Sequence, residues 1–171
     1  MKKIILATLL TLSTLSADWI GQAGLGYSRG DNGANYVTAF YGAEVYMGAG
    51  LRVEYTKNFS EHAEFSKEDL SRYGLFLTYQ FSLIPYLSIT PKMGIVNSDG
   101  EVVSKTDLVK AAISSTKFTY GLELDYYYSN FVSFYLGYTD YGNELDVKNL
   151  RADDIDKLDT ANYTLGFKLH L

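Results

Sequence analysis

Hydrophobic and polar residues alternate along most of the chain from Trp19 onward, and a 3.6-residue period is weak. Between Lys117 and Tyr126, one face carries only apolar and aromatic residues: Phe118, Tyr120, Leu122, Leu124 and Tyr126. A period of two is typical of β-strands with one apolar face. The alternation predicts eight strands, near residues 19–29, 36–46, 49–57, 71–82, 86–96, 116–127, 131–140 and 161–171.

The connections between these strands alternate in length. Short ones lie around 47–48, 82–85 and 128–130, and longer ones cover 30–35, 58–70, 97–115 and 141–160. Short connections favour antiparallel hairpins, so the short turns gather at one end of the sheet and the long loops at the other. Eight strands that meander in this way can close into a barrel, which removes both exposed edges. Pro91 argues against a central strand at 86–96, because proline cannot donate a ladder hydrogen bond.

Alternation alone fits either a soluble barrel with an apolar interior or a membrane barrel with the inverse arrangement. The large residues of the apolar face would overpack an eight-stranded interior. Most mid-strand glycines lie on the polar face, where they leave room in a narrow lumen. The strand bodies carry no charge on the apolar face, as lipid contact requires, since a lipid-facing Arg or Lys costs about 2–4 kcal/mol. The sequence therefore predicts an all-β fold, an eight-stranded antiparallel up-and-down transmembrane β-barrel.

The polar face supplies charged residues that we expect to form a structural network in the lumen. They are Glu44, Arg52, Glu54, Arg72, Lys92, Lys117, Glu123, Asp125 and Lys168, nearly balanced in sign. The alternative is that these charges line an ion path. Eight strands leave no wide aqueous channel, so we favour buried ion pairs that fill the lumen.

Aromatic residues on the apolar face are grouped by depth. If the chain starts at the periplasmic end, four lie near that interface: Trp19, Phe81, Tyr126 and Phe134. Five lie near the opposite one: Tyr27, Tyr55, Tyr73, Tyr138 and Tyr163. Amphipathic rings prefer both lipid–water boundaries, so we expect two interface girdles. The alternative is the general preference of tyrosine for strands.

The first residues predict a targeting segment. A basic start, Met1-Lys2-Lys3, precedes an apolar stretch from Ile4 to Leu15 that is too short for a membrane helix, which indicates a secretory signal peptide over residues 1–17. Cleavage after Ala17 is plausible, although it leaves Leu15 at the −3 position; cleavage one residue earlier fits the small-residue rule somewhat better. Removing Lys2 and Lys3 from 15 basic residues leaves 13 against 20 acidic ones, a net charge of −7. An acidic chain without a basic patch argues against nucleic-acid binding.

The C-terminal segment Thr164-Leu165-Gly166-Phe167-Lys168-Leu169-His170-Leu171 has Gly166 two residues after a polar residue, then hydrophobic residues at Leu169 and Leu171. This spacing resembles the C-terminal targeting signal of bacterial outer-membrane β-barrels, although that family usually ends in Phe. With the other features, residues 18–171 resemble the small eight-stranded OmpA/OmpX/Ail-type barrels. The resemblance implies insertion into the outer membrane, contact with outer-membrane lipid and lipopolysaccharide, and recognition of the last strand by the barrel-assembly machinery.

Candidate chemistry is sparse. The absence of Cys excludes disulfides, Cys-ligated zinc and thiol catalysis. His62 lies among Ser60, Glu61 and Glu64, the residue types of a hydrolase or acyltransferase site, but residues so close in sequence rarely form a triad. His170 is expected in the lumen near the periplasmic mouth, with a structural role. We therefore predict no catalytic residue, no metal ligand and no cofactor.

The predicted function lies in the loops. The loop 141–160 is rich in Asp and Glu and lacks EF-hand spacing, so a solvated acidic loop is favoured over a Ca²⁺ or Mg²⁺ site. The loop 97–115 mixes apolar and charged residues, as an extended hairpin, a short helix or a partner contact would. We expect a non-enzymatic protein of surface interaction, adhesion or envelope integrity that contacts an extracellular protein through 58–70, 97–115 and 141–160. The alternatives are a lipid A-modifying enzyme and a narrow small-solute channel.

Overall fold

The computed structural model describes residues 20–31, 33–60, 65–104, 110–142, 147–148 and 161–171. The predicted signal peptide 1–17, Trp19, His62 and most of the segment 141–160 lie outside these residues. Within the described ranges, no helix is long and apolar enough to cross a membrane. The strands are β1 (Ile20–Gly30), β2 (Asn35–Tyr46), β3 (Ala49–Asn58), β4 (Phe65–Tyr79), β5 (Phe81–Ile84), β6 (Leu87–Ser104), β7 (Lys110–Tyr127), β8 (Val132–Asp140), β9 (Val147–Lys148) and β10 (Ala161–His170).

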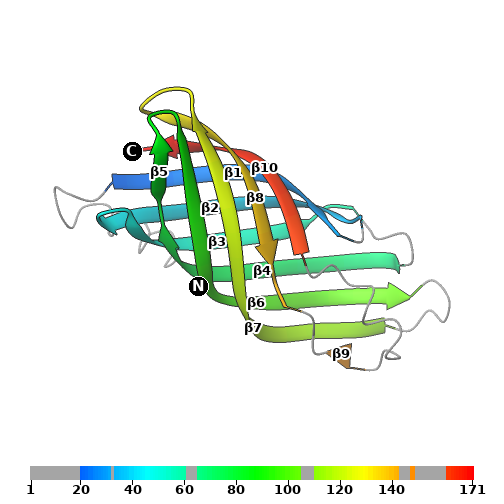
Figure 1. Cartoon of the computed structure of the whole chain (residues 1–171). Helices are drawn as coiled ribbons and strands as arrows, with labels where there is room; N and C mark the ends of the chain where they lie inside the picture. Colours follow the sequence, from blue (N-terminus) through cyan, green and yellow to red (C-terminus); the bar gives the residue numbers. More distant parts are fainter. Residues whose placement is uncertain (1–19, 32, 61–64, 105–109, 143–146, 149–160) are drawn as a thin grey trace.

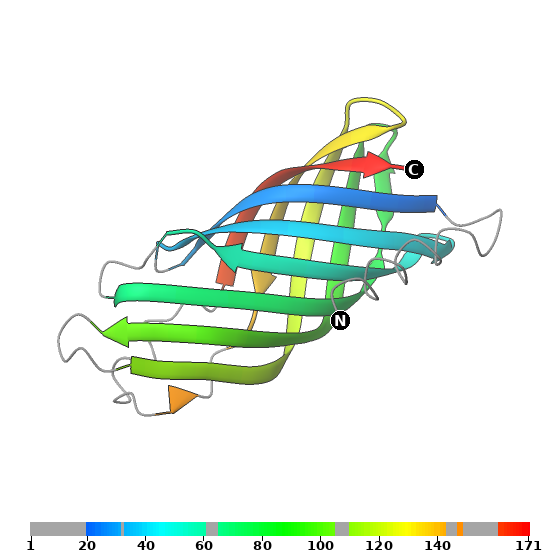
Figure 2. The same cartoon turned by 180° about the vertical axis from the view of Figure 1, so that it is seen from behind.

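The eight long strands form one closed antiparallel barrel, as the sequence predicted. Neighbours along the sheet run β6-β4-β3-β2-β1-β10-β8-β7, and β6 pairs with β7 to close it. The first and last strands meet along their whole length, from Gln22 opposite His170 to Gly30 opposite Asn162. Figure 1 places the C-terminus and β5 at one end and β9 at the other, and Figure 2 shows the same barrel from behind.

Three strands are longer than predicted, which corrects two of the four longer connections. β4 begins at Phe65, inside the predicted loop 58–70. β6 extends to Ser104 and β7 begins at Lys110, so the predicted loop 97–115 is mostly a hairpin. Of the arrangements expected for 97–115, the described part forms extended strands. The ends of β4, β6 and β7 reach furthest from the C-terminus (Figure 2).

The two short strands are continuations of long ones. β5 follows β4 after a break at Gln80 and pairs with the start of β6. β9 keeps the register of β8 along β7, because the same number of residues separates Asp140 from Val147 and their partners Tyr120 from Ile113. β8 and β9 are therefore two segments of one interrupted strand that pairs with β7.

Pro91 lies inside β6, so the expectation that it argues against a central strand there is wrong. It pairs with Leu122 on the β7 side. On the other side, the β4 pairing ends at Lys92 and the β5 pairing begins at Ile89. The missing N–H of proline therefore lies where β6 changes partners, which explains why a central strand tolerates it.

The outer surface of the barrel carries a belt of exposed apolar side chains. Leu75, Leu122 and Leu165, on three different strands, are 57%, 49% and 59% exposed. The residues that alternate with the outward ones along the strands point into the lumen and are almost fully buried, among them Arg52, Glu123 and Lys168. This arrangement is the inverse of a soluble protein and is what a bilayer requires, because only helices and closed barrels satisfy their backbone groups in lipid.

The inside-out arrangement reverses at the far ends of β4, β6 and β7. There four inward positions are apolar and fully buried, while Glu68, Ser98 and Ser115 stay polar. With residues at the start of β2, the apolar ones form a cluster: Ala34, Tyr36, Leu70, Val102, Ala111 and Ile113. The outward positions become polar, as in Asp69, Asp99 and Ser114. Since strand parity does not change, the surroundings of the sheet must change from lipid to water at this level. After the orientation expected from the sequence, we call this part of β4, β6 and β7 the extracellular sheet, residues 65–71, 97–104 and 110–116.

Candidate functional site

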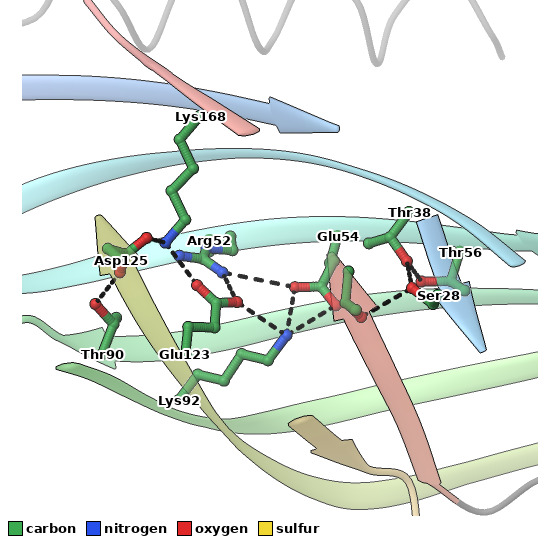
Figure 3. Close-up of polar contacts among 11 residues, drawn as sticks. Ser28, Thr38, Arg52, Glu54, Thr56, Thr90, Lys92, Glu123, Asp125 and Lys168 are labelled. Carbon is green, nitrogen blue, oxygen red and sulfur yellow. Dashed lines mark hydrogen bonds and ion pairs between the residues drawn. The ribbon is translucent and has the colours of Figure 1, made fainter. Parts of the chain in front are cut away.

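Six charged side chains from four strands meet in one network inside the barrel (Figure 3). Arg52 and Glu54 come from β3, Glu123 and Asp125 from β7, and the two lysines, Lys92 and Lys168, from β6 and β10. Because side chains two apart on a strand point the same way, each of β3 and β7 delivers two charges to the lumen. Three cations face three carboxylates, so the network is neutral.

Short contacts connect the network across the lumen. Glu123 is its centre: its two oxygens lie 2.5 Å from Arg52 Nη1 and 2.7 Å from Lys168 Nζ. Lys168 Nζ also lies 2.5 Å from Asp125 Oδ1, whose second oxygen accepts a hydrogen bond of 3.0 Å from Thr90. At the other side, Lys92 Nζ donates to both oxygens of Glu54 at 2.8 and 3.0 Å.

Burial makes this network structurally demanding. The side chains of Arg52, Glu123 and Lys168 are no more than 2% exposed. Removing one partner of a buried pair leaves a charge without compensation and typically costs about 3–5 kcal/mol. Ion pairs therefore cross the lumen and hold opposite walls of the barrel together.

Aromatic rings support the cations, a feature that the sequence analysis did not predict. The Arg52 guanidinium lies 4.2 Å from the centre of the Phe40 ring, and Lys92 Nζ lies 4.9 Å from that of Phe76. Such contacts stabilise a desolvated cation by about 2 kcal/mol. The Phe40 ring lies over Gly24, where an added Cβ would meet ring carbons at 2.2 Å. The pairing of Gly24 with the inward aromatic residue Phe40 was the sequence signal that could have predicted an aromatic ring inside the lumen.

Three predicted network residues lie elsewhere. Arg72 stacks between two rings, 4.9 Å from that of Tyr36 and 4.3 Å from that of Tyr141. Glu44 lies at the mouth of the barrel, where Oε1 accepts a hydrogen bond of 2.6 Å from Gly48 N–H. Lys117 is half-buried and makes no ion pair with a described residue. These three do not join the six-residue network.

A hydroxyl ladder continues the lumen on the extracellular side of the network (Figure 3). Ser28 Oγ lies 2.8 Å from the hydroxyl of Thr164 and 3.1 Å from that of Thr38, which is 3.0 Å from that of Thr56. The ladder crosses four adjacent strands, β10, β1, β2 and β3. Arg72 lies opposite Thr56 in the register of β3 and β4, and the buried apolar cluster lies beyond it, so successive groups of side chains fill the barrel.

The predicted interface aromatics that the structure describes all lie on the outer surface. Toward the extracellular end, the rings of Tyr55 and Tyr73 are 4.9 Å apart, and those of Tyr138 and Tyr163 are 5.4 Å apart. Tyr27 contacts Phe59, a residue that the prediction did not include. Phe81, Tyr126 and Phe134, at the other end, are about half exposed. Their role as girdles remains a prediction.

The C-terminal residues and the described histidine also have defined places. Gly166 lies opposite Gly26 in β1, while Leu169 and Leu171 face outward with exposed side chains. Their role as an assembly signal remains a prediction. His170 lies at the mouth, 2.9 Å from Ser133 Oγ, and its ring packs on Tyr127. No group of three acidic, His or Cys side chains in the described ranges could hold a metal ion.

Comparisons with known proteins support the architecture. No family model matches the sequence, and no curated protein matches it. The N-terminal β-barrel domain of Pseudomonas aeruginosa OprF is similar in structure, with a TM-score of 0.66 and 12% identity over 89% of this chain and 97% of that one. Ail, the attachment invasion locus protein of Yersinia pestis, gives a TM-score of 0.53 and 15% identity over 90% and 97% of the two chains.

An enzyme shares the same fold. The outer-membrane enzyme PagL matches with a TM-score of 0.52 and 10% identity, over 88% of this chain and 98% of that one. Identities this low show the fold alone. The closed barrel, its apolar belt and these similarities show the fold of the small eight-stranded β-barrels of bacterial outer membranes.

Proposed function

We propose that this protein acts at the cell surface, as an adhesin or another surface-interaction protein, through its extracellular sheet. The observation that carries the proposal is the length of the strands. A transmembrane strand needs about 9–11 residues, whereas β6 and β7 have 18 each. The additional residues form a sheet that buries an apolar cluster on one side and exposes polar residues on the other, as a sheet does in water.

The charge of the extracellular sheet suggests the chemistry of its partner. Its outward face carries Asp69, Asp99 and Glu101, and Lys57 beside it is paired with Asp69. Lys67 and Lys110 lie at the same outward register, opposite Val103, so the face carries both signs, which favours a partner with a polar surface of mixed charge. Ail has been solved in complex with the heparin analogue sucrose octasulfate, an anionic ligand. We expect no comparable binding of heparin by this chain.

The filled lumen supports a binding role over transport. A neutral network of buried ion pairs, a hydroxyl ladder and an apolar cluster follow one another from the mouth to the extracellular end. A conducting barrel would need these layers to separate. Planar-bilayer recording should therefore detect no large, steady conductance, and such a conductance would favour the channel alternative.

Adherence of bacteria that express the protein to cultured epithelial cells tests the proposal. The double variant Asp99→Lys, Glu101→Lys reverses charge on the outward face of the extracellular sheet. The control, Ser129→Lys, adds a positive charge at the exposed short turn between β7 and β8, at the other end of the barrel. We expect adherence to fall at least severalfold for the first variant and to stay unchanged for the second, at equal surface amounts. Equal adherence of wild-type and deletion strains would contradict the proposal.

A deletion strain separates the remaining alternatives. Loss of envelope integrity would appear as sensitivity to detergent and to large antibiotics, without a change in adherence. Changed acyl chains in the mass spectrum of lipid A would favour a lipid A-modifying enzyme.

A further inference from the structure

A cavity of about 340 Å³ opens at the end of the barrel where the short turns gather. This is the end that carries β5 and the C-terminus in Figure 1. Its volume lies at the lower end of the roughly 300–1,000 Å³ of small-molecule pockets. Its polar lining consists mainly of Gln22, Glu44, Gln80, Tyr127, Asn130 and His170. We call it the mouth cavity.

The mouth is hollow because one strand leaves the barrel wall there. The alternation of β4 ends at Gln80, whose N–H donates to the Gly48 carbonyl at 2.8 Å instead of to a strand. All four residues of β5 are exposed, so neither face of that strand fills the lumen. The bulge between Ser82 and Ile84 turns the hairpin further away. The cavity is thus a consequence of strand geometry.

The mouth cavity has one carboxylate without a cationic partner. Glu44 is held by the two-residue turn after β2, in which Met47 and Gly48 both have positive φ, as a type I′ turn requires. Gly48 N–H donates a hydrogen bond to Glu44 Oε1, and no group of the described chain binds Glu44 Oε2. Asp125, an acidic residue inside the lumen, is already paired with Lys168. The mouth therefore has an uncompensated negative charge.

The other walls offer hydrogen bonds. The side-chain amides of Gln22 and Asn130 have no partner among the described residues. Gln80 Nε2 donates to the Tyr127 hydroxyl at 2.6 Å, which leaves the Gln80 carbonyl oxygen able to accept. A ligand with several hydroxyl groups would meet donors and acceptors from at least three strands.

We propose that the mouth cavity binds a small hydroxylated molecule with one primary ammonium group, an amino sugar being the class that matches it. The ammonium group contacts Glu44 as a charge-assisted hydrogen bond. The hydroxyl groups bond the amides of Gln22, Gln80 and Asn130. The site faces the side opposite the extracellular sheet, so it is independent of the proposed surface interaction.

Titration of the folded ¹⁵N-labelled barrel in nanodiscs with D-glucosamine tests this inference by NMR. We expect saturable shifts of the side-chain amides of Gln22, Gln80 and Asn130, with a Kd on the order of 1 mM. D-glucose, which lacks the ammonium group, should shift them at least tenfold more weakly. Equal responses to both sugars, or no saturable response to D-glucosamine, would overturn the proposal.

Two variants assign the charge. Glu44→Gln removes the charge but keeps an oxygen for Gly48 N–H, so the turn is retained, and we expect about tenfold weaker binding. Asp31→Asn removes a charge at the opposite end of the barrel and should leave the Kd unchanged. Heat-modifiable gel mobility reports whether each variant is folded. A folded Glu44→Gln barrel with wild-type affinity would overturn the role of Glu44.

Discussion

The membrane-spanning part of the barrel and its extracellular sheet use the same strands with opposite polarity. In β7, the outward residue Leu122 contacts the surroundings while Glu123 points into a charged interior. Farther along the same strand, Ser114 points outward and Ile113 is buried in an apolar cluster. The strand keeps its alternation and its pairing with β6 throughout.

The difference shows that the solvent, rather than the backbone, decides which face of a strand is apolar. In lipid, apolar side chains lose nothing by facing out, and polar groups must pair inside. In water, burial of apolar area drives folding, and polar residues remain outside. A single β-ladder can therefore satisfy both rules if its polarity reverses at the membrane surface. The tyrosines Tyr55 and Tyr73 lie near this level on the outer surface.

Removing the central carboxylate should have the largest effect on the membrane-spanning part. Glu123→Ala leaves Arg52, Lys92 and Lys168 without their shared partner. We expect the free energy of unfolding to fall by about 3–5 kcal/mol. Urea titration in lipid vesicles, with folded and unfolded barrels separated by gel mobility, measures it. Wild-type stability would mean that the network does not hold the walls together.

Truncating the apolar cluster should act on the extracellular sheet alone. Leu70→Ala opens a cavity among residues that are at most 1% exposed, which costs about 2–5 kcal/mol. Hydrogen exchange should accelerate in residues 97–104 and 110–116, while the exchange of the strand segments in the belt stays slow. Equal acceleration in both parts would show that they are one cooperative unit.

A charge placed on the outer face should distinguish the two regions directly. Leu122→Arg places a cation in the apolar belt and should destabilise the barrel by about 2–4 kcal/mol. Ser114→Arg, on the same face of the same strand, should change stability by no more than about 0.5 kcal/mol. The same urea titration compares them. Similar losses for both variants would refute a membrane boundary between these positions.

Truncating Asn58, whose side chain bonds the backbone of β4 where no strand does, should have the smallest effect on the free energy of unfolding. Asn58 Nδ2 donates to the Glu68 carbonyl at 2.7 Å, and its Oδ1 accepts from Leu70 N–H at 2.7 Å. In this way Asn58 covers the edge of β4 beyond the end of β3. Asn58→Ala should cost about 1–3 kcal/mol, observed as faster exchange of the Leu70 amide. An unchanged rate would mean that this edge is protected by other groups.

The sequence was sufficient to predict the barrel because lipid imposes a period-two pattern with an uncharged face. It also assigned nine charges to the polar face by parity, but it missed Glu68, which is buried and lies in the predicted loop 58–70. It did not predict how the charges pair: Glu123 contacts Arg52 and Lys168 from strands distant in the sequence, and only the barrel register brings them together. Strand parity places Lys117 on the same face as the network residues, so it could not show that Lys117 stays outside the network.

The extracellular sheet was missed for a different reason. The predicted loops 58–70 and 97–115 have no apolar outward face, so they do not resemble the other strands. Their alternation is present with reversed phase: Leu70 and Val102 have the parity of Arg72 and Ser98. A search for reversals of phase within one alternating segment would have found them.

Accessibility along the outward face of β7 tests the central claim most directly. The chain has no cysteine, so single-Cys variants at Leu124, Leu122, Thr116 and Ser114 each carry one spin label. In nanodiscs, labels at Leu124 and Leu122 should collide with oxygen and be protected from a water-soluble nickel relaxant, whereas labels at Thr116 and Ser114 should show the reverse. Equal nickel accessibility at all four positions would contradict a polarity reversal at the membrane surface.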